Sequence, residues 1–398
     1  EETSAPDGII GKEGIVMNLC RWLCGFFFFV VLAFLPQRGI ASWPPEITVG
    51  LSQGVFEVRL AATDGALHVY ADTDQAPILE VPSWKELDIR MQQAQFLVNG
   101  QEIKGERLLI RSDAVGFVKI NDAPYRGSVT LLKKNGITVI NNVLVEDYLY
   151  GVIPKEMPPT WSAEALQAQS VAARTFALKN RKRHSAEGFD LCNTSHCQVY
   201  EGMAAETRTT TDAVNHTRGE VLFYNGSVID ALFHTDSGGM TEFSEHVWGS
   251  SVPYLCAVPD LQTQTQPWIR AIPMSEFMQK VEQNGTVLGT LKEIHLSSLV
   301  VGKGSGDRSP SGRVRSAELI GTKGRIVLSG NDLRTFFSLP STLFDMHVGR
   351  TDVVFSGYGS GHGLGLSQWG AKALAEKGSS YKDILFHYYT GVTLEKLY

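Results

Sequence analysis

Residues 162–183 constrain the fold most, because they predict a helix that is buried on most of its sides. Small and apolar side chains occupy nearly every face of it, namely Ala165, Leu166, Ala168, Val171, Ala172, Ala173, Phe176, Ala177 and Leu178. Ser162 suits the N-cap and Glu164 the first turn, and basic residues among 179–183 suit the other end of the helix dipole. Other elements must therefore cover this helix.

The residues from about Ile47 to Ile140 follow a different pattern, with short runs in which apolar and polar side chains alternate. Segments 55–60 and 116–120 are examples. The pairs Asn99-Gly100 and Asn135-Gly136 lie near the ends of such runs, and Asn-Gly is a strong signal for a tight hairpin. This part of the chain is therefore predicted to be antiparallel β-structure.

The chain of 398 residues is long enough for about two domains, each with its own core. The expected fold class is α+β, with an antiparallel β-rich module at 43–125 and a mixed α/β core at 126–398. Residues 281–338 look like an α+β insertion in this core, with a solvated glycine-rich loop at 302–312. Ser380 and Asp383 have the spacing of a capping box that opens a helix near the C-terminus.

The N-terminal residues 1–42 are predicted to be a targeting leader, with an extension at 1–16 ahead of Met17. An apolar run of about 14 residues follows Arg21, and a small, polar stretch ends it near Ala41. The run is shorter than the roughly 20 residues that a spanning helix needs, so a cleaved signal peptide is expected, with an uncleaved membrane anchor as the alternative. The net charge of −6 is mild and gives no reason to expect nucleic acid as a partner.

A short stretch of the core contains two thiols and two imidazoles, from His184, Cys192, His196 and Cys197. This set suits a closed, tetrahedral, structural Zn²⁺ site. In an exported protein a Cys192–Cys197 disulfide is the alternative. A catalytic zinc is not expected, because four protein ligands leave no open coordination position.

Glu156 is the carboxylate in a segment that holds three prolines, at positions 154, 158 and 159. Prolines fix φ and remove backbone donors, so a stiff, non-helical connection is predicted here. Glu156 is either a general acid/base whose pKa is raised by partial burial, or an exposed or structurally paired carboxylate. Arg174 is a candidate partner, since a charged residue in the middle of a buried helix needs one.

Two glycine-rich segments are further candidates. In the first, Gly238-Gly239 follows His234 and Ser237, which reads as a tight turn or as a close approach to a ligand. In the second, residues 357–365 contain His362 and lead to Gln368 and Trp369. The glycine spacing of the second segment does not fit a nucleotide-binding loop. This segment is either a turn with Trp369 in the core or a loop that contacts a bulky substrate.

Together these segments resemble the stage II sporulation protein D (SpoIID)/LytB family of peptidoglycan-active proteins. The resemblance covers about residues 126–398 and rests on the order of VIPKEMP (152–158), EALQAQSVAARTFA (164–177), CQVYEG (197–202), FH (233–234) with SGG (237–239), PYL (253–255), GHGLGLSQWGA (361–371) and HYYTG (387–391). Joint occurrence in this order is far more specific than any single segment.

The resemblance implies an exported lytic transglycosylase that cleaves peptidoglycan glycan strands, often strands whose peptides an amidase has removed. Glu156 takes the place of the catalytic glutamate, and Arg174 that of an arginine implicated in substrate handling. Residues expected to contact substrate in a cleft are Arg174, His234, Ser237, His362, Gln368 and Tyr388. No catalytic cofactor is implied, and some members bind zinc through two Cys and two His. The alternative is a non-catalytic, peptidoglycan-binding enhancer of a cell-wall amidase.

Overall fold

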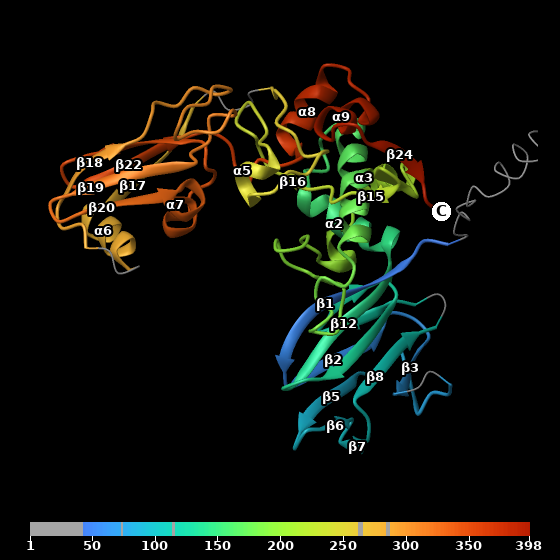
Figure 1. Ribbon diagram of the computed structural model, residues 1–398. Coiled ribbons are helices and arrows are strands. Elements are labelled where there is room, and N and C mark those ends of the chain that lie inside the picture. Colours follow the sequence, from blue (N-terminus) through green and yellow to red (C-terminus); the bar gives the residue numbers. More distant parts are fainter. Residues whose placement is uncertain (1–42, 73–74, 114–115, 262–265, 284–286) are drawn as a thin grey trace, which may run out of the picture. The chain divides into compact units, whose positions relative to one another are not determined.

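The computed structural model describes residues 43–398 except 73–74, 114–115, 262–265 and 284–286 (Figure 1). It contains helices together with several separate, mainly antiparallel sheets, which confirms the α+β class. The predicted leader at 1–42 lies outside the described residues. Within the described part of the chain, no helix combines the length and the apolar character needed to cross a membrane.

Two sheets form the N-terminal part of the described chain. The first has seven strands in the order β13-β1-β12-β11-β8-β3-β4, and the second has six in the order β10-β9-β2-β5-β6-β7. Their strands are β1 (Glu46–Val55), β2 (Glu57–Ala62), β3 (Ala66–Ala71), β4 (Leu79–Pro82), β5 (Leu87–Gln92), β6 (Gln95–Val98), β7 (Gln101–Ile103), β8 (Arg107–Ser112), β9 (Val118–Ile120), β10 (Ala123–Tyr125), β11 (Ser128–Lys133), β12 (Ile137–Leu144) and β13 (Leu191–Cys192). Among these described strands, β1 and β13 pair in parallel and the other pairs are antiparallel.

The alternating pattern of the sequence appears as alternating burial. In β2, Val58 and Leu60 are buried whereas Glu57 and Arg59 are exposed. Buried apolar side chains from both sheets form one cluster, while Ile47 and Val49 of β1 join the core around α3 instead. The seven-stranded sheet extends past residue 125, because β11 pairs with β8 and β12 pairs with β1. The sheet therefore continues beyond residue 125, the predicted end of the β-rich module, because β11 and β12 belong to it.

The predicted central helix is present as α3 (Ala163–Lys179), and residues 165–177 are all buried. It packs against α2 (Val145–Glu156), α4 (Arg208–His216), α8 (Gln368–Glu376) and α9 (Tyr381–Tyr388) (Figure 1). The helix ends at Lys179, before the predicted end at 183. Asn180 explains the early end, because its side-chain amide donates to the Phe176 carbonyl at 3.0 Å and to Asp230 at 2.8 Å.

The prediction of a non-helical segment around Glu156 is wrong. Helix α2 continues through Pro154 and includes Glu156 as its last residue. A proline removes one backbone donor, and the buried apolar side chains of α2 hold the helix across this gap. The helix ends where Met157 precedes Pro158, a position that favours extended backbone, and Met157 has φ −131° and ψ 140°.

The rest of the core surrounds α3. A three-stranded sheet has the order β15-β14-β24, and β16 pairs in parallel with β23. This second pairing aligns Phe233 with Leu366 and His234 with Ser367, so it joins the two glycine-rich segments. The predicted capping box of Ser380 and Asp383 is confirmed at the start of α9. The elements not yet named are η1 (Gly202–Ala205), β14 (Glu220–Tyr224), β15 (Ser227–Val228), β16 (Phe233–His234), α5 (Ser244–Trp248), β23 (Leu366–Ser367) and β24 (Thr393–Lys396).

Two further three-stranded sheets, in the orders β17-β22-β21 and β18-β19-β20, share an apolar cluster of their own. Their elements are β17 (Trp268–Pro273), α6 (Met274–Glu282), β18 (Leu291–His295), β19 (Ser316–Gly321), β20 (Arg325–Ser329), α7 (Gly330–Phe337), β21 (Phe344–Val348) and β22 (Asp352–Gly357). The loop at 302–312 is solvated only in its first half. Arg308, Ser309 and Ser311 are buried, because Arg308 pairs with Asp345 and both serines bond Glu242.

Candidate active site

A pocket of about 540 Å³ contains the main candidate residue, Glu156, and falls within the range of roughly 300–1,000 Å³ that is common for ligand sites. Three of the residues expected to contact substrate also line it: His234, His362 and Gln368. The remaining lining residues are Phe176, Arg183, Ser195, His196, Cys197, Val199, Leu232, Phe233, Thr235, Trp248, Arg334 and Gly361. The structure therefore joins the proline segment, the Cys/His cluster and both glycine-rich segments around one space.

Glu156 supplies the single carboxylate among the described residues that line this pocket. The backbone N–H of Val199 donates to Oε1 at 3.4 Å, and the side-chain amide of Gln368 donates to Oε2 at 3.3 Å. Burial raises the pKa of Glu156 above its ordinary value, and these two hydrogen bonds oppose that rise only in part. The group is thus prepared to carry a proton into the pocket, as a general acid must.

His234 and His362 form a neutral pair on the pocket wall, with ring centroids 5.5 Å apart. His234 Nδ1 donates to the Leu364 carbonyl at 3.0 Å, which leaves Nε2 as an acceptor. That Nε2 atom is buried and has no protein partner among the described residues. Burial lowers the pKa of His234 well below its ordinary value and that of His362 to about 4, so neither ring is charged at neutral pH.

Gly361 is required at its position. Its φ is +110°, and a Cβ there would lie 2.7 Å from His234 Cβ. The glycine-rich segment therefore approaches His234 of β16 closely, which places His362 on the pocket wall, and contact of this segment with a substrate stays a prediction. The other alternative placed Trp369 in the core, whereas its side chain is 41% exposed and packs edge-on against Trp161 at 5.0 Å.

Ser237 and Tyr388 do not reach the pocket, contrary to the expected contact with substrate. Both side chains are fully buried, and their hydroxyls donate to Asp260, at 2.6 Å from Ser237 and 2.8 Å from Tyr388. Gly370 would collide with this group if it had a Cβ, since Asp260 Oδ1 would be 2.2 Å away. These residues hold the start of α8, and with it Gln368, in place.

Arg174 is likewise not among the residues that line the pocket, so the structure does not place it where the expected substrate contact requires. It has no exposed surface, and its guanidinium binds both carboxylate oxygens of Glu146, at 2.9 and 2.8 Å. Glu146 also accepts hydrogen bonds from the backbone N–H of Gly219 and the hydroxyl of Tyr398. The partner that a buried arginine needs is therefore Glu146, and the pair links α2, α3 and the C-terminal residue.

The four predicted metal ligands gather at one point beside the pocket, with ligand atoms all within 4.8 Å of one another. Cys197 Sγ lies 3.4 Å from His184 Nε2 and 3.7 Å from His196 Nδ1, and Cys192 Sγ lies 3.7 Å from the same His196 atom. Zn–S and Zn–N bonds of about 2.3 and 2.0 Å in a tetrahedron place neighbouring ligand atoms about 3.3–3.8 Å apart. Both thiols are free in this structure, and the separations between Cys197 Sγ, Cys192 Sγ and the imidazole nitrogens lie in the range that a shared metal ion requires.

Comparison with known proteins gives two family matches. Residues 133–224 match a family described as stage II sporulation protein, and residues 263–365 match a domain of unknown function, DUF8618. Stage II sporulation protein D of Bacillus subtilis is 34% identical over 275 residues, which span 65% of this chain and 76% of that protein. An uncharacterized protein of Brachyspira hyodysenteriae is 35% identical over 282 residues, 69% of this chain and 73% of that protein.

The chain belongs to the stage II sporulation protein D family. The amidase enhancer of Bacillus subtilis is a further relative, 35% identical over 288 residues, which are 62% of this chain and 40% of that protein. The stage II sporulation protein match contains Glu156, the Cys/His cluster and Val199, which together form one side of the pocket. The match to the domain of unknown function contains Arg334 and His362, which lie on the pocket wall as well.

The sequence reasoning missed two arginines that line the pocket, Arg183 and Arg334. Arg183 was assigned only to the basic end of α3. Arg334 lies in α7, in a segment that carries no recognisable motif. The one signal for this segment was its amphipathic pattern, in which Leu333 and Phe337 are buried while Arg334 remains partly exposed. Such a pattern predicts a helix but does not reveal which pocket the helix lines.

Proposed function

We propose that this protein is an exported lytic transglycosylase that cleaves the bond between N-acetylmuramic acid and N-acetylglucosamine in peptidoglycan. The observation that carries the proposal is Glu156, a carboxyl with a raised pKa in a pocket whose other described lining residues include no second carboxylate. Most glycosidases use two carboxylates. A single acid/base suffices when the nucleophile belongs to the sugar itself.

The proposed reaction proceeds as follows. The protonated Glu156 donates its proton to the glycosidic oxygen as the bond from that oxygen to C1 of N-acetylmuramic acid breaks. The resulting carboxylate accepts the proton of the C6 hydroxyl on the same ring, and O6 forms the new bond to C1. The products are a strand with a free 4-hydroxyl and a strand that ends in a 1,6-anhydro sugar. Glu156 regains its proton, and no water is consumed.

The neighbours of Glu156 fit this double role. Val199 and Gln368 each donate to one carboxylate oxygen, so they orient the group and stabilise it after it has lost its proton. His234 offers its Nε2 atom as a neutral acceptor for a sugar hydroxyl or amide. Because the pKa values of His234 and His362 are both lowered by burial, these rings do not compete with Glu156 as acids.

Analysis of the products tests the proposal. Purified protein is incubated with glycan strands from which an amidase has removed the peptides, and the products are examined by mass spectrometry. We expect 1,6-anhydro ends, which lie 18 mass units, one water, below reducing ends. Reducing ends would indicate a hydrolase, and intact strands would contradict the proposed cleavage.

A second candidate function comes from the relative named amidase enhancer. In this alternative the same pocket binds glycan without cleaving it, and the protein stimulates a cell-wall amidase. The product analysis separates the two functions if it is repeated with an amidase on complete peptidoglycan. No anhydro ends, together with faster release of peptides in the mixture, would favour the enhancer.

We further propose that His184, Cys192, His196 and Cys197 hold a structural Zn²⁺. The separations of their ligand atoms fit a tetrahedral site, and two Cys with two His is a common donor set for zinc. Bound zinc would supply a crosslink and no chemistry on the substrate. Its importance for the pocket comes from Val199, which follows Cys197 by two positions and donates to Glu156.

Metal analysis tests this site. We expect about one zinc per chain by elemental analysis, and we expect Cys197→Ser to lose the metal and a large part of the thermal stability, because structural zinc contributes folding free energy directly. Cys256→Ser is the matched control, since Cys256 is a free thiol outside the cluster. A metal-free, chelator-insensitive protein with a Cys192–Cys197 disulfide would refute the zinc site.

A further inference from the structure

Arg334 is the most distinctive charged group of the pocket that the proposed mechanism does not use. Arg334 lines the same pocket as Glu156, His234 and His362, and its charge contributes to lowering the pKa values of both histidines. Within the described part of the chain, Arg334 has no carboxylate partner and no hydrogen-bond acceptor for its side chain. A partly buried cation without a partner is costly unless a ligand supplies the opposite charge.

The charged side chains that line the pocket favour an anionic ligand. Arg183 and Arg334 are both on its wall, whereas Glu156 is the one carboxylate among its described lining residues. The buried Nε2 of His234, which has no protein partner, adds a polar atom beside Arg334. Positive charge therefore exceeds negative charge in the space where the proposed substrate binds.

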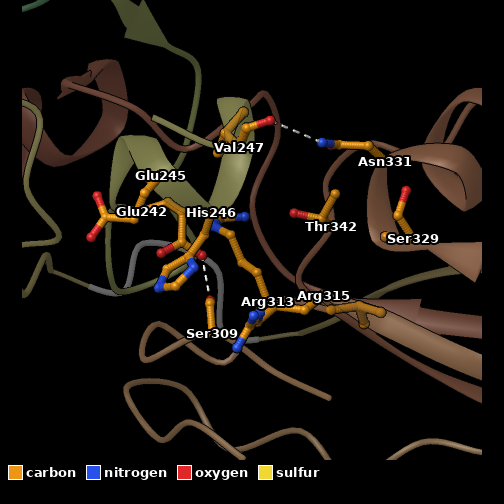
Figure 2. A pocket seen from close by; sticks show the side chains of 13 residues that line it. Glu242, Glu245, His246, Val247, Ser309, Arg313, Arg315, Ser329, Asn331 and Thr342 are labelled. Carbon is orange, nitrogen blue, oxygen red and sulfur yellow. Dashed lines mark hydrogen bonds between the residues drawn. The ribbon is translucent and has the colours of Figure 1, made fainter. Parts of the chain in front are cut away.

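A polar junction lies beside the start of α7, the helix that carries Arg334. Figure 2 shows this junction around a second pocket of about 320 Å³. In Figure 2, Ser309 donates to the carboxylate of Glu242, and the amide of Asn331 donates to the Val247 carbonyl at 3.5 Å. Ser311 donates to the same carboxylate. Arg313 reaches across to the Ser237 carbonyl at 2.7 Å. Asn331 and Arg334 belong to the same helix, so the bond to Val247 ties the helix of Arg334 to α5.

The chemistry of the proposed substrate supplies a matching anion. The lactyl group of N-acetylmuramic acid is attached to the ring whose C1 is attacked, so it must enter the pocket that contains Glu156. While a peptide is attached, the lactyl group ends in a neutral amide. When an amidase removes the peptide, it ends in a carboxylate, for which an arginine is a suitable partner.

We propose that Arg334 binds the free lactyl carboxylate and makes the protein selective for strands without peptides. This inference rests on the proposed function, because it takes the glycan to be the ligand of the pocket. It assigns a role to the segment that matches the domain of unknown function: α7 of that segment presents the residue that distinguishes a carboxylate from an amide.

The test uses a matched pair of substrates. Glycan strands without peptides are divided, and the lactyl carboxylates of one half are converted to methylamides. Affinity and cleavage are measured for both halves with wild type, Arg334→Gln, Arg334→Lys and the control Arg325→Gln, whose side chain is 78% exposed in β20. We expect wild type to bind the carboxylate strands roughly tenfold more tightly, the scale of one charge-assisted hydrogen bond.

Arg334→Gln is expected to bind both strands equally, with a raised KM and little change in kcat, whereas Arg334→Lys restores part of the preference. Added salt should reduce the wild-type preference as well. Equal binding of both strands by wild type, or an undiminished preference in Arg334→Gln, would overturn the inference. Selective binding without cleavage would instead refute the proposed function and leave the carboxylate site standing.

Discussion

Glu156→Gln is expected to lower glycan cleavage by about 10²-fold or more, because glutamine keeps the shape of the side chain but cannot donate and recover a proton. The measurement is the rate of formation of anhydro ends on strands without peptides. Glu201→Gln is the matched control. Glu201 is an exposed carboxylate that pairs with Lys155 at 3.0 Å, and its replacement should leave the rate unchanged.

The pH profile of the same reaction gives a second view of Glu156. The acid must be protonated, so the rate should fall as pH rises through the raised pKa of this group. Since burial favours the protonated form in the folded protein, Glu156→Gln should not reduce the free energy of unfolding at neutral pH. If Glu156→Gln still forms anhydro ends at the wild-type rate, Glu156 is not the acid that cleaves the glycosidic bond.

Glu146→Gln is expected to reduce the free energy of unfolding by about 3–5 kcal/mol, because it leaves the cation of Arg174 buried without its counter-charge. Neither side chain is more than 2% exposed, so solvent cannot replace the lost partner. Burial alone would raise the pKa of Glu146, but Arg174 and the other hydrogen bonds hold this pKa below its ordinary value. This stabilisation is present above the unfolded-state pKa and is lost as pH falls through the folded-state pKa.

Urea denaturation of wild type, Glu146→Gln and Asp212→Asn measures the effect. Asp212 lies 3.9 Å from Arg208 in an exposed pair, with 69% and 95% of the two side chains accessible, so its replacement should cost less than about 1 kcal/mol. The result also decides between two roles for Arg174. A Glu146→Gln protein with unchanged stability and weakened glycan binding would restore the direct substrate role that the family resemblance implied.

The sequence predicted those features of the fold that depend on local pattern. Residues 165–177 are buried, as expected from the small and apolar side chains on nearly every face of that helix, and Ser380 and Asp383 form the capping box that their spacing predicts. The helix around Glu156 was missed for the opposite reason. Three nearby prolines argue against a helix locally, whereas the burial of α2 against the core, which is a tertiary effect, stabilises it.

The candidate site was predictable only where a residue type carries its own chemistry. The clustering of His184 and Cys197 was predictable because thiols and imidazoles in one short stretch suit a shared metal ion. The importance of Glu156 was predictable from the family motif. The partners could not be predicted. Glu146 lies 28 positions before Arg174, and the pattern around it gives no sign of their pairing. Arg334 reaches the pocket only through the packing of α7, which no short-range pattern specifies.

The pocket is built from segments that are remote in the chain, and under the proposed function this has a consequence for when the protein can first cut glycan. Gln368, which bonds Glu156, lies 212 positions after it. A chain that has been synthesised only as far as α3 carries Glu156 but has neither Gln368 nor the pocket residues that follow α3 in the sequence. Contacts between positions so far apart are slow to form, because the intervening chain must first lose conformational entropy. Glycan cutting should therefore begin only with the finished molecule, a built-in delay that requires no inhibitor.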